Sequence, residues 1–166
     1  MTHRVVVAGI GSELRRDDGA GPAVVERIRR LGVPDDWALW SGPAPLDLLG
    51  LWAGCELAVV VDATHNDGEP GTIRVLEIDS ASVDAGQGRA PGSTRGLNST
   101  HGMGLVTVLQ LARVVDRMPP RVVLVGIEGD DFGAGACLSP AVAGTVDEAA
   151  KKVFELARQA TCMGGT

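Results

Sequence analysis

The sequence predicts an open α/β sandwich in which helices cover a mostly parallel sheet. Short apolar runs of strand length alternate along the chain with segments whose apolar residues recur at helical spacing. Aromatic residues make up only 3% of the chain, whereas 23 residues are glycine, a balance that suits buried parallel strands joined by tight turns. The order strand, helix, strand, helix, strand, strand, helix, strand, helix then favours right-handed crossovers.

The first strand and helix are organised around a glycine turn. The apolar run 5–8 enters Gly9-Ile10-Gly11, which begins like the dinucleotide fingerprint G-x-G-x-x-G. The third glycine of that fingerprint would fall on Leu14, so nucleotide binding is not favoured. The helix that follows is expected to bury four apolar residues: Ala23, Val24, Ile28 and Leu31.

Apolar runs and helical periodicity place the remaining elements. Further strands are predicted at 37–41, 57–63, 72–78 and 121–127. Further helices are predicted at 46–52, from 104 towards the prolines at 119 and 120, and at 140–160 with Ser139 as N-cap. Because residues 64–71 are too few for a parallel crossover, strand 72–78 should run antiparallel. Residues 79–100 form an unusually long loop, which is expected to be functional or disordered.

Composition bounds the class of protein. The 166 residues fit one domain spanning 1–166. The net charge of -6, without any cluster of Lys and Arg, argues against nucleic acid and anionic membranes as partners. Without a membrane-length apolar run or a signal-peptide pattern, a cytoplasmic protein is expected. Cys55, Cys137 and Cys162 lack C-x-x-C spacing and are expected to be reduced thiols, with Cys137 alone near the active edge.

Polar residues at strand ends and helix starts form the candidate site. Asp62 is the first polar group of its apolar strand, Asp18 lies near the start of the first helix, and His101 precedes or opens the third. In such sheets ligands bind outside the carboxyl ends of the strands, so these three side chains, and as a further candidate Glu128, should meet at one edge. Two carboxylates and an imidazole make an open metal site suited to zinc, nickel, iron or manganese.

A plainer interpretation of these residues stays open. Asp62 would then bind backbone amides at the end of its strand, and Asp18 or Asp17 would cap a helix. His65 is expected to be a solvated residue of a turn, and its membership of the ligand set is left open. Arg15 and Arg16 are expected to be solvated, and Asp17 is expected to be a surface acid.

Four motifs, in order, carry a resemblance to a known family. They are GIGSELRRDDGAG (9–21), VVVDATHNDGEPGT (59–72), STHGMGL (99–105) and GIEGDDFGAGACLSPAV (126–142). Together they resemble the hydrogenase maturation endopeptidase family over nearly the whole chain, the loop 80–98 excepted. The resemblance implies a three-layer α/β/α fold like that of the phosphorylase/hydrolase group, with a five-stranded mixed sheet of order 2-1-3-5-4 and strand 4 antiparallel.

The resemblance also implies an activity and a site. The family removes a C-terminal extension from the large subunit of a [NiFe] hydrogenase after nickel insertion, and three of its residues contact the metal. Matched by motif, these are Asp18, Asp62 and His101. Ser12 stands where many members have Asn, and residues 41–43 read Ser-Gly-Pro where some have Asp-Gly-Gly. The second departure leaves the hydrogenase class of the substrate open.

The expected function is therefore an aspartic or metal-assisted endopeptidase that recognises nickel carried by its partner, the large-subunit precursor. Asp18 and Asp62 are the expected catalytic residues, and with His101 they are the expected metal ligands. The protein itself is expected to be monomeric and to hold no nickel when isolated, and the loop 79–98 is a candidate lid. A non-catalytic checkpoint of nickel insertion and a small-molecule hydrolase on the same fold are the alternatives.

Overall fold

The computed structural model describes residues 2–78 and 102–163. It shows a five-stranded sheet of order β2-β1-β3-β5-β4. The strands are β1 (Val5–Ile10), β2 (Trp37–Gly42), β3 (Leu57–Thr64), β4 (Ile73–Ile78) and β5 (Arg121–Glu128). Strands β2, β1, β3 and β5 run parallel, and β4 pairs antiparallel with β5. The predicted order and the antiparallel fourth strand are confirmed.

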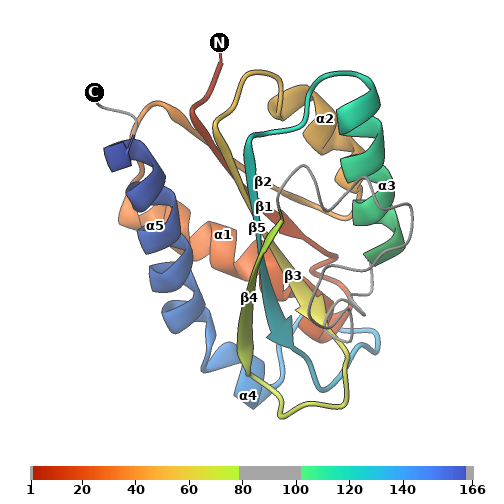
Figure 1. The fold of residues 1–166 in the computed structure, drawn as a ribbon. Coiled ribbons are helices and arrows are strands. Elements are labelled where there is room, and N and C mark those ends of the chain that lie inside the picture. The colour runs from red at the N-terminus through yellow and green to blue at the C-terminus, as the bar shows by residue number, and fades with distance from the viewer. Residues whose placement is uncertain (1, 79–101, 164–166) are drawn as a thin grey trace.

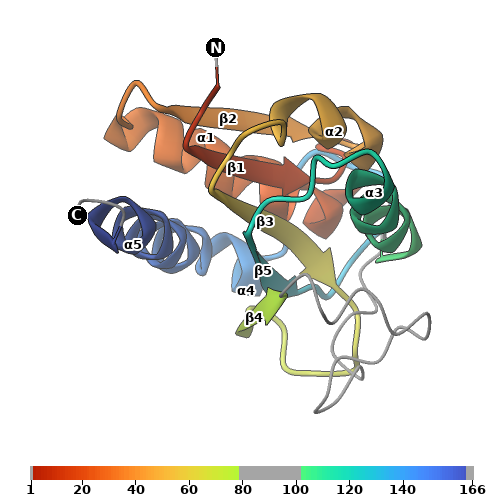
Figure 2. The ribbon, with the colours of Figure 1, turned by 45° about the horizontal axis from the view of Figure 1, so that its top comes forward.

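Helices cover both faces of this sheet (Figure 1). They are α1 (Ala20–Leu31), α2 (Leu48–Leu51), α3 (Gly102–Val114), α4 (Pro140–Ala143) and α5 (Val146–Met163), with 3₁₀ turns η1 (Arg16–Gly19) and η2 (Pro45–Asp47). Figure 2 shows α1 and α5 on one side of the strands and α2 and α3 on the other. The three-layer α/β/α architecture is confirmed. Within the described residues, no helix is both long and apolar enough to span a bilayer.

The alternation of side chains along the strands builds two cores. On β3, Val59 and Val61 pack in the core that α1 and α5 cover, whereas Ala58 and Val60 pack in the core that α2 and α3 cover. Successive side chains of a strand point to opposite faces. Asp62 therefore belongs to the face of the sheet that α2 and α3 cover.

Glycines let α1 approach the sheet closely. A methyl group on Gly21, in the first turn of α1, would lie 2.6 Å from the carbonyl oxygens of both Ile10 and Val61. Gly9, which lies in β1 and not in the turn that the sequence predicts, faces the backbone of Gly21 in the same way. The Gly-Ile-Gly segment thus serves helix–strand packing, because only glycine fits such a contact.

The structure corrects two predictions about the ends of helices. Leu31, which was expected to be buried, is 48% exposed because it is the last residue of α1, and Val25 is buried instead. The helix predicted at 46–52 is only the turn η2 followed by the four-residue α2. The proline at the start of η2 supplies no backbone N–H, so it suits a short helical turn.

The long helix predicted at 140–160 is also wrong, because the chain forms two helices there. Helix α4 ends at Ala143 and α5 begins at Val146. Between them, the hydroxyl of Thr145 donates hydrogen bonds to the carbonyls of Gly71 and Ala141, both at 3.0 Å. This bond to Gly71 ties the break between the helices to the turn before β4.

Candidate functional site

Asp62 lies near the carboxyl end of β3 and is only 6% exposed. On one side it stands in register with Gly126 of β5, which has no side chain. On the other side the pairing of β3 with β1 ends one residue earlier, at Val61 and Gly9. The carboxylate of Asp62 is therefore held at the edge of the sheet where the chain leaves β1 at Gly11.

Asp18 lies in η1 at the same edge and is completely buried. Its Oδ2 accepts a hydrogen bond of 2.9 Å from the backbone N–H of Ser12. The turn η1 packs against β3, the strand that carries Asp62. Neither η1 nor α1 has a side-chain cap, so helix capping does not account for Asp18.

The third predicted ligand, His101, lies outside the described residues. Helix α3 begins at the next residue, Gly102. Figure 1 shows its first turn at the end of the sheet to which the arrowheads of β3 and β5 point, and α3 covers the face to which Asp62 belongs. Within the described residues, 2–78 and 102–163, no three His, Cys, Asp or Glu side chains form a group that would hold a metal ion. The described part of the site therefore consists of two buried carboxylates.

Asp17 is not the surface acid that the sequence predicts. It is completely buried, and its carboxylate accepts hydrogen bonds from the backbone N–H groups of Asp130, Asp131 and Ser139 and from the hydroxyl of Ser139. Burial by itself raises the pKa of Asp17, but the backbone and hydroxyl donors outweigh it and hold the pKa below its ordinary value. Ser139 is consequently no side-chain N-cap of α4, because its hydroxyl is committed to Asp17.

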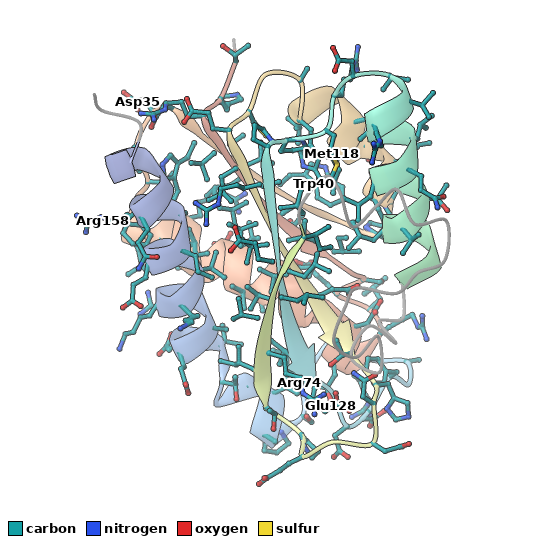
Figure 3. The ribbon with its side chains drawn as sticks, viewed as in Figure 1. Asp35, Trp40, Arg74, Met118, Glu128 and Arg158 are labelled. Atoms are coloured by element: carbon teal, nitrogen blue, oxygen red, sulfur yellow. The ribbon has the colours of Figure 1, made fainter. Side chains whose placement is uncertain are left out.

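Glu128, at the end of β5, binds the turn between β3 and β4 (Figure 3). Its carboxylate accepts hydrogen bonds from the hydroxyl of Thr64 at 2.7 Å, the N–H of Asn66 at 2.6 Å and the N–H of Gly68 at 3.1 Å. The side-chain amide of Asn66 donates a longer hydrogen bond of 3.4 Å to the same carboxylate. Glu128 is thus at the predicted edge, and its hydrogen bonds hold the turn that follows Asp62.

The pH dependence of stability should report this arrangement. Burial raises the pKa of Glu128, but the N–H of Asn66, the hydroxyl of Thr64 and the N–H of Gly68 lower it below the ordinary 4.5. Between the lowered pKa of the folded protein and the ordinary 4.5, the unfolded chain binds more protons than the folded one. The stability that the Glu128 hydrogen bonds contribute is therefore present above pH 4.5 and is lost as pH falls through the folded pKa. In Glu128→Gln, denaturant unfolding should show a free energy lower by about 1–3 kcal/mol at neutral pH and a flatter decline in acid. An unchanged acid decline would contradict the assignment.

The other polar candidates are accounted for in the described residues. His65 is exposed, as expected, and its ring lies edge-on to that of Phe132 at 5.6 Å between centroids. Arg16 is exposed and pairs with Asp131 at 3.4 Å. Cys55 is buried, which raises the pKa of its thiol to about 12, whereas Cys137 is exposed. The side chain of Cys162 lies outside the described residues.

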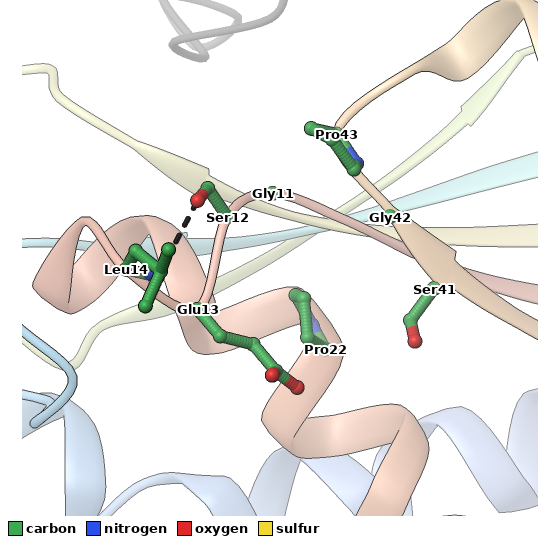
Figure 4. A pocket seen from close by; sticks show the side chains of 8 residues that line it. All are labelled: Gly11, Ser12, Glu13, Leu14, Pro22, Ser41, Gly42 and Pro43. Atoms are coloured by element: carbon green, nitrogen blue, oxygen red, sulfur yellow. Dashed lines mark hydrogen bonds between the residues drawn. The ribbon is translucent and has the colours of Figure 1, made fainter.

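A pocket of about 300 Å³ opens between the segment after β1 and the end of β2 (Figure 4). One wall comes from Ser12, Glu13 and Leu14, and the other from the end of β2. The remaining lining residues are Gly11, Pro22, Ser41, Gly42 and Pro43. The N–H of Ser12 binds Asp18, so one residue of the pocket lining is hydrogen-bonded to a predicted metal ligand. Leu14, 73% exposed, offers an apolar side chain at its rim.

Comparison with known proteins identifies the family. The family model for hydrogenase maturation protease matches residues 22–156 of the chain. The chain belongs to the hydrogenase maturation protease family. It is therefore a peptidase. The matched range includes Asp62 and His101, and it begins shortly after Asp18.

Individual relatives extend the match over nearly the whole chain. Hydrogenase expression/formation protein HupD of Rhodobacter capsulatus is 33% identical over 159 residues, covering 92% of this chain and 71% of that protein. The hydrogenase maturating endopeptidase HybD from E. coli has a TM-score of 0.76 at 25% identity, covering 94% of this chain and 93% of that one. The HybD protease of Thermococcus kodakarensis, 24% identical, shares the fold with a TM-score of 0.73 over 93% of this chain and 99% of its own.

Proposed function

We propose that this protease removes the C-terminal extension of a [NiFe] hydrogenase large-subunit precursor after nickel insertion, in the cytoplasm and as a monomer of one domain. Asp18, Asp62 and His101 contact the nickel that the precursor already carries. The observation that carries the proposal is the burial of Asp18 and Asp62 at one edge of the sheet, in a chain that belongs to this protease family. Nickel is part of the substrate, so the isolated protein needs no metal of its own.

The chemistry of the two carboxylates fits this role. Buried negative charges are stabilised by a cation placed between them, and oxygen and imidazole ligands are ones that nickel accepts. When Asp18 and Asp62 bind the substrate's nickel, they fix the precursor on the edge of the sheet and bring the scissile peptide bond beside them. The position of the substrate is thereby set before any bond is broken.

Hydrolysis then needs one water molecule and one proton acceptor. The oxygen of water adds to the carbonyl carbon of the scissile bond, and one of the carboxylates Asp18 and Asp62 takes the water proton. The same proton passes to the leaving nitrogen as the C–N bond breaks, which yields a carboxylic acid and a free amine. At neutral pH the remaining water proton passes from the acid to the amine, so the final products are a carboxylate and an ammonium group. The substrate-bound metal polarises the carbonyl or the water and so lowers the barrier. The pocket lined by Ser12, whose N–H binds Asp18, gives room for part of the extension.

The direct test uses a nickel-loaded large-subunit precursor from a cell that lacks this protein. Incubation with the purified protein should shorten the precursor by its extension, which mass spectrometry of the intact subunit detects. A precursor that stays uncut while the protein binds it would contradict the proposal and favour the checkpoint alternative. Cleavage of short peptides without the large subunit, at a comparable rate, would favour a general hydrolase.

A further inference from the structure

The carboxylate of Asp17 joins two segments that are far apart in the sequence. Its Oδ1 accepts the N–H of Ser139 at 2.7 Å. Its Oδ2 accepts the N–H groups of Asp130 and Asp131, at 2.8 and 2.9 Å, and the hydroxyl of Ser139 at 2.8 Å. Both oxygens are therefore occupied by donors from the loop 129–139, which follows β5.

Backbone hydrogen bonds continue this junction. The N–H of Arg16 donates to Gly135 at 2.8 Å, and the N–H of Gly135 donates to Leu14 at 2.9 Å. The N–H of Asp17 donates to Asp131 at 3.0 Å. The exposed ion pair of Arg16 with Asp131 adds little, since solvent screens it. The loop 129–139 thus lies along residues 14–17 and is bonded to them by backbone and by Asp17.

The junction fixes the residue that follows it. Asp18 shares η1 with Asp17, and its N–H closes the turn on the carbonyl of Arg15 at 3.1 Å. Its carboxylate reaches back to the N–H of Ser12 at 2.9 Å. A shift of Asp17 therefore moves Asp18 within the same short turn and disturbs its bond to Ser12.

We propose that Asp17 is a positioning residue, whose bonds to the loop 129–139 hold Asp18 in place at the candidate site. The part concerning catalysis rests on the proposed function, whereas the part concerning Asp18's position does not. Asp17 is assigned no contact with the substrate, because both of its oxygens accept hydrogen bonds from the loop 129–139. Because both of its oxygens accept backbone N–H groups, Asn at this position would turn its own amide towards at least one of those donors.

Amide hydrogen exchange tests the positioning directly, because the Ser12 amide is bonded to Asp18. Val60, fully buried in the centre of β3, reports global opening. In Asp17→Asn, the ratio of the Ser12 rate to the Val60 rate should rise about tenfold or more, as expected for loss of bonds to a charged group. Ser139→Ala removes only the hydroxyl donor and should raise the ratio about threefold.

Glu128→Gln is the matched control, since Glu128 is an equally buried and multiply bonded carboxylate on a different turn. It should lower stability and so raise the Val60 rate, and it should not raise the ratio of the Ser12 rate to the Val60 rate. An unchanged ratio in both Asp17→Asn and Ser139→Ala would overturn the proposal, whatever their stability. If Asp17→Asn does not fold, the ratio in Ser139→Ala decides.

Kinetics supply a second readout that a merely structural role would not move. On the nickel-loaded precursor, folded Asp17→Asn should lose about tenfold or more in kcat while KM stays within about twofold of the wild-type value. Equal changes in kcat and in the folded fraction would count against positioning. If wild-type protein does not cleave the precursor, the proposed function fails, and the exchange ratio still decides the role of Asp17.

Discussion

Asp62→Asn should abolish cleavage of the nickel-loaded precursor while leaving the fold intact. The substitution keeps the size of the side chain and removes its charge, which is the property that binding of a cation needs. Loss of a metal contact together with a proton acceptor is expected to reduce kcat/KM by about 10³-fold or more. Intact-mass analysis of the large subunit over time gives the rate. Asp18→Asn should produce a loss of similar size, because both carboxylates are proposed to contact the same metal.

The same two variants separate a functional role from a structural one. Asp62 is buried at 6% exposure and Asp18 at 0%, and a buried negative charge usually costs stability. Neutralising Asp62 should therefore leave the free energy of unfolding unchanged or raise it, as is common at functional sites. Asp147→Asn is the control, since Asp147 is 68% exposed and pairs only on the surface with Arg27. Cleavage by Asp62→Asn at the wild-type rate would refute the site assignment.

The sequence predicts the placement of Asp62 and Asp18 because it depends on local pattern. An unbroken apolar run must be a buried strand, and the first carboxylate after it must lie at the end of that strand. Topology then brings the ends of β1 and β3 to one edge, and the short connection after β3 forces β4 to run antiparallel. None of these steps requires knowledge of distant contacts.

The role of Asp17 could not be predicted in this way. Asp17 and Asp18 are neighbours of the same type, and only the loop 129–139 distinguishes them. Its donors come from residues more than a hundred positions away, beyond any periodic signal. The same loop takes the hydroxyl of Ser139 away from helix capping. The family resemblance contained one hint of this contact. Two of the motifs on which it rests, 9–21 and 126–142, are joined by backbone hydrogen bonds in the structure.

The glycine pattern near the first strand has an explanation in distant contacts as well. Gly9-Ile10-Gly11 resembles a phosphate-binding turn because both need backbone without a side chain. In this fold the space is filled by Gly21 of α1, and Gly11 adopts φ 142° with its Cβ position against the carbonyl of Asp18. The glycines are required by protein packing, and they let the turn that holds Asp18 lie close to β3.

Precursor that lacks nickel should resist cleavage even at high protease concentration. In the proposed mechanism Asp18, Asp62 and His101 bind the substrate through its metal, so removing the metal removes both the anchor and the polarisation of the scissile carbonyl. The rate should fall by about 100-fold or more relative to the loaded precursor. The comparison requires matched precursor preparations from cells grown with and without nickel, with metal content measured for each.

Restoring nickel to the same precursor should restore cleavage, which distinguishes a missing metal from a misfolded substrate. Asp62→Asn protein added to the loaded precursor serves as the second control, because it should reproduce the slow rate without any change to the substrate. Rapid cleavage of nickel-free precursor by wild-type protein would contradict metal recognition. In that event the buried carboxylates would have to act on the peptide bond directly, as an acid and base pair. Asp18 and Asp62 would then recognise the peptide extension and not the metal.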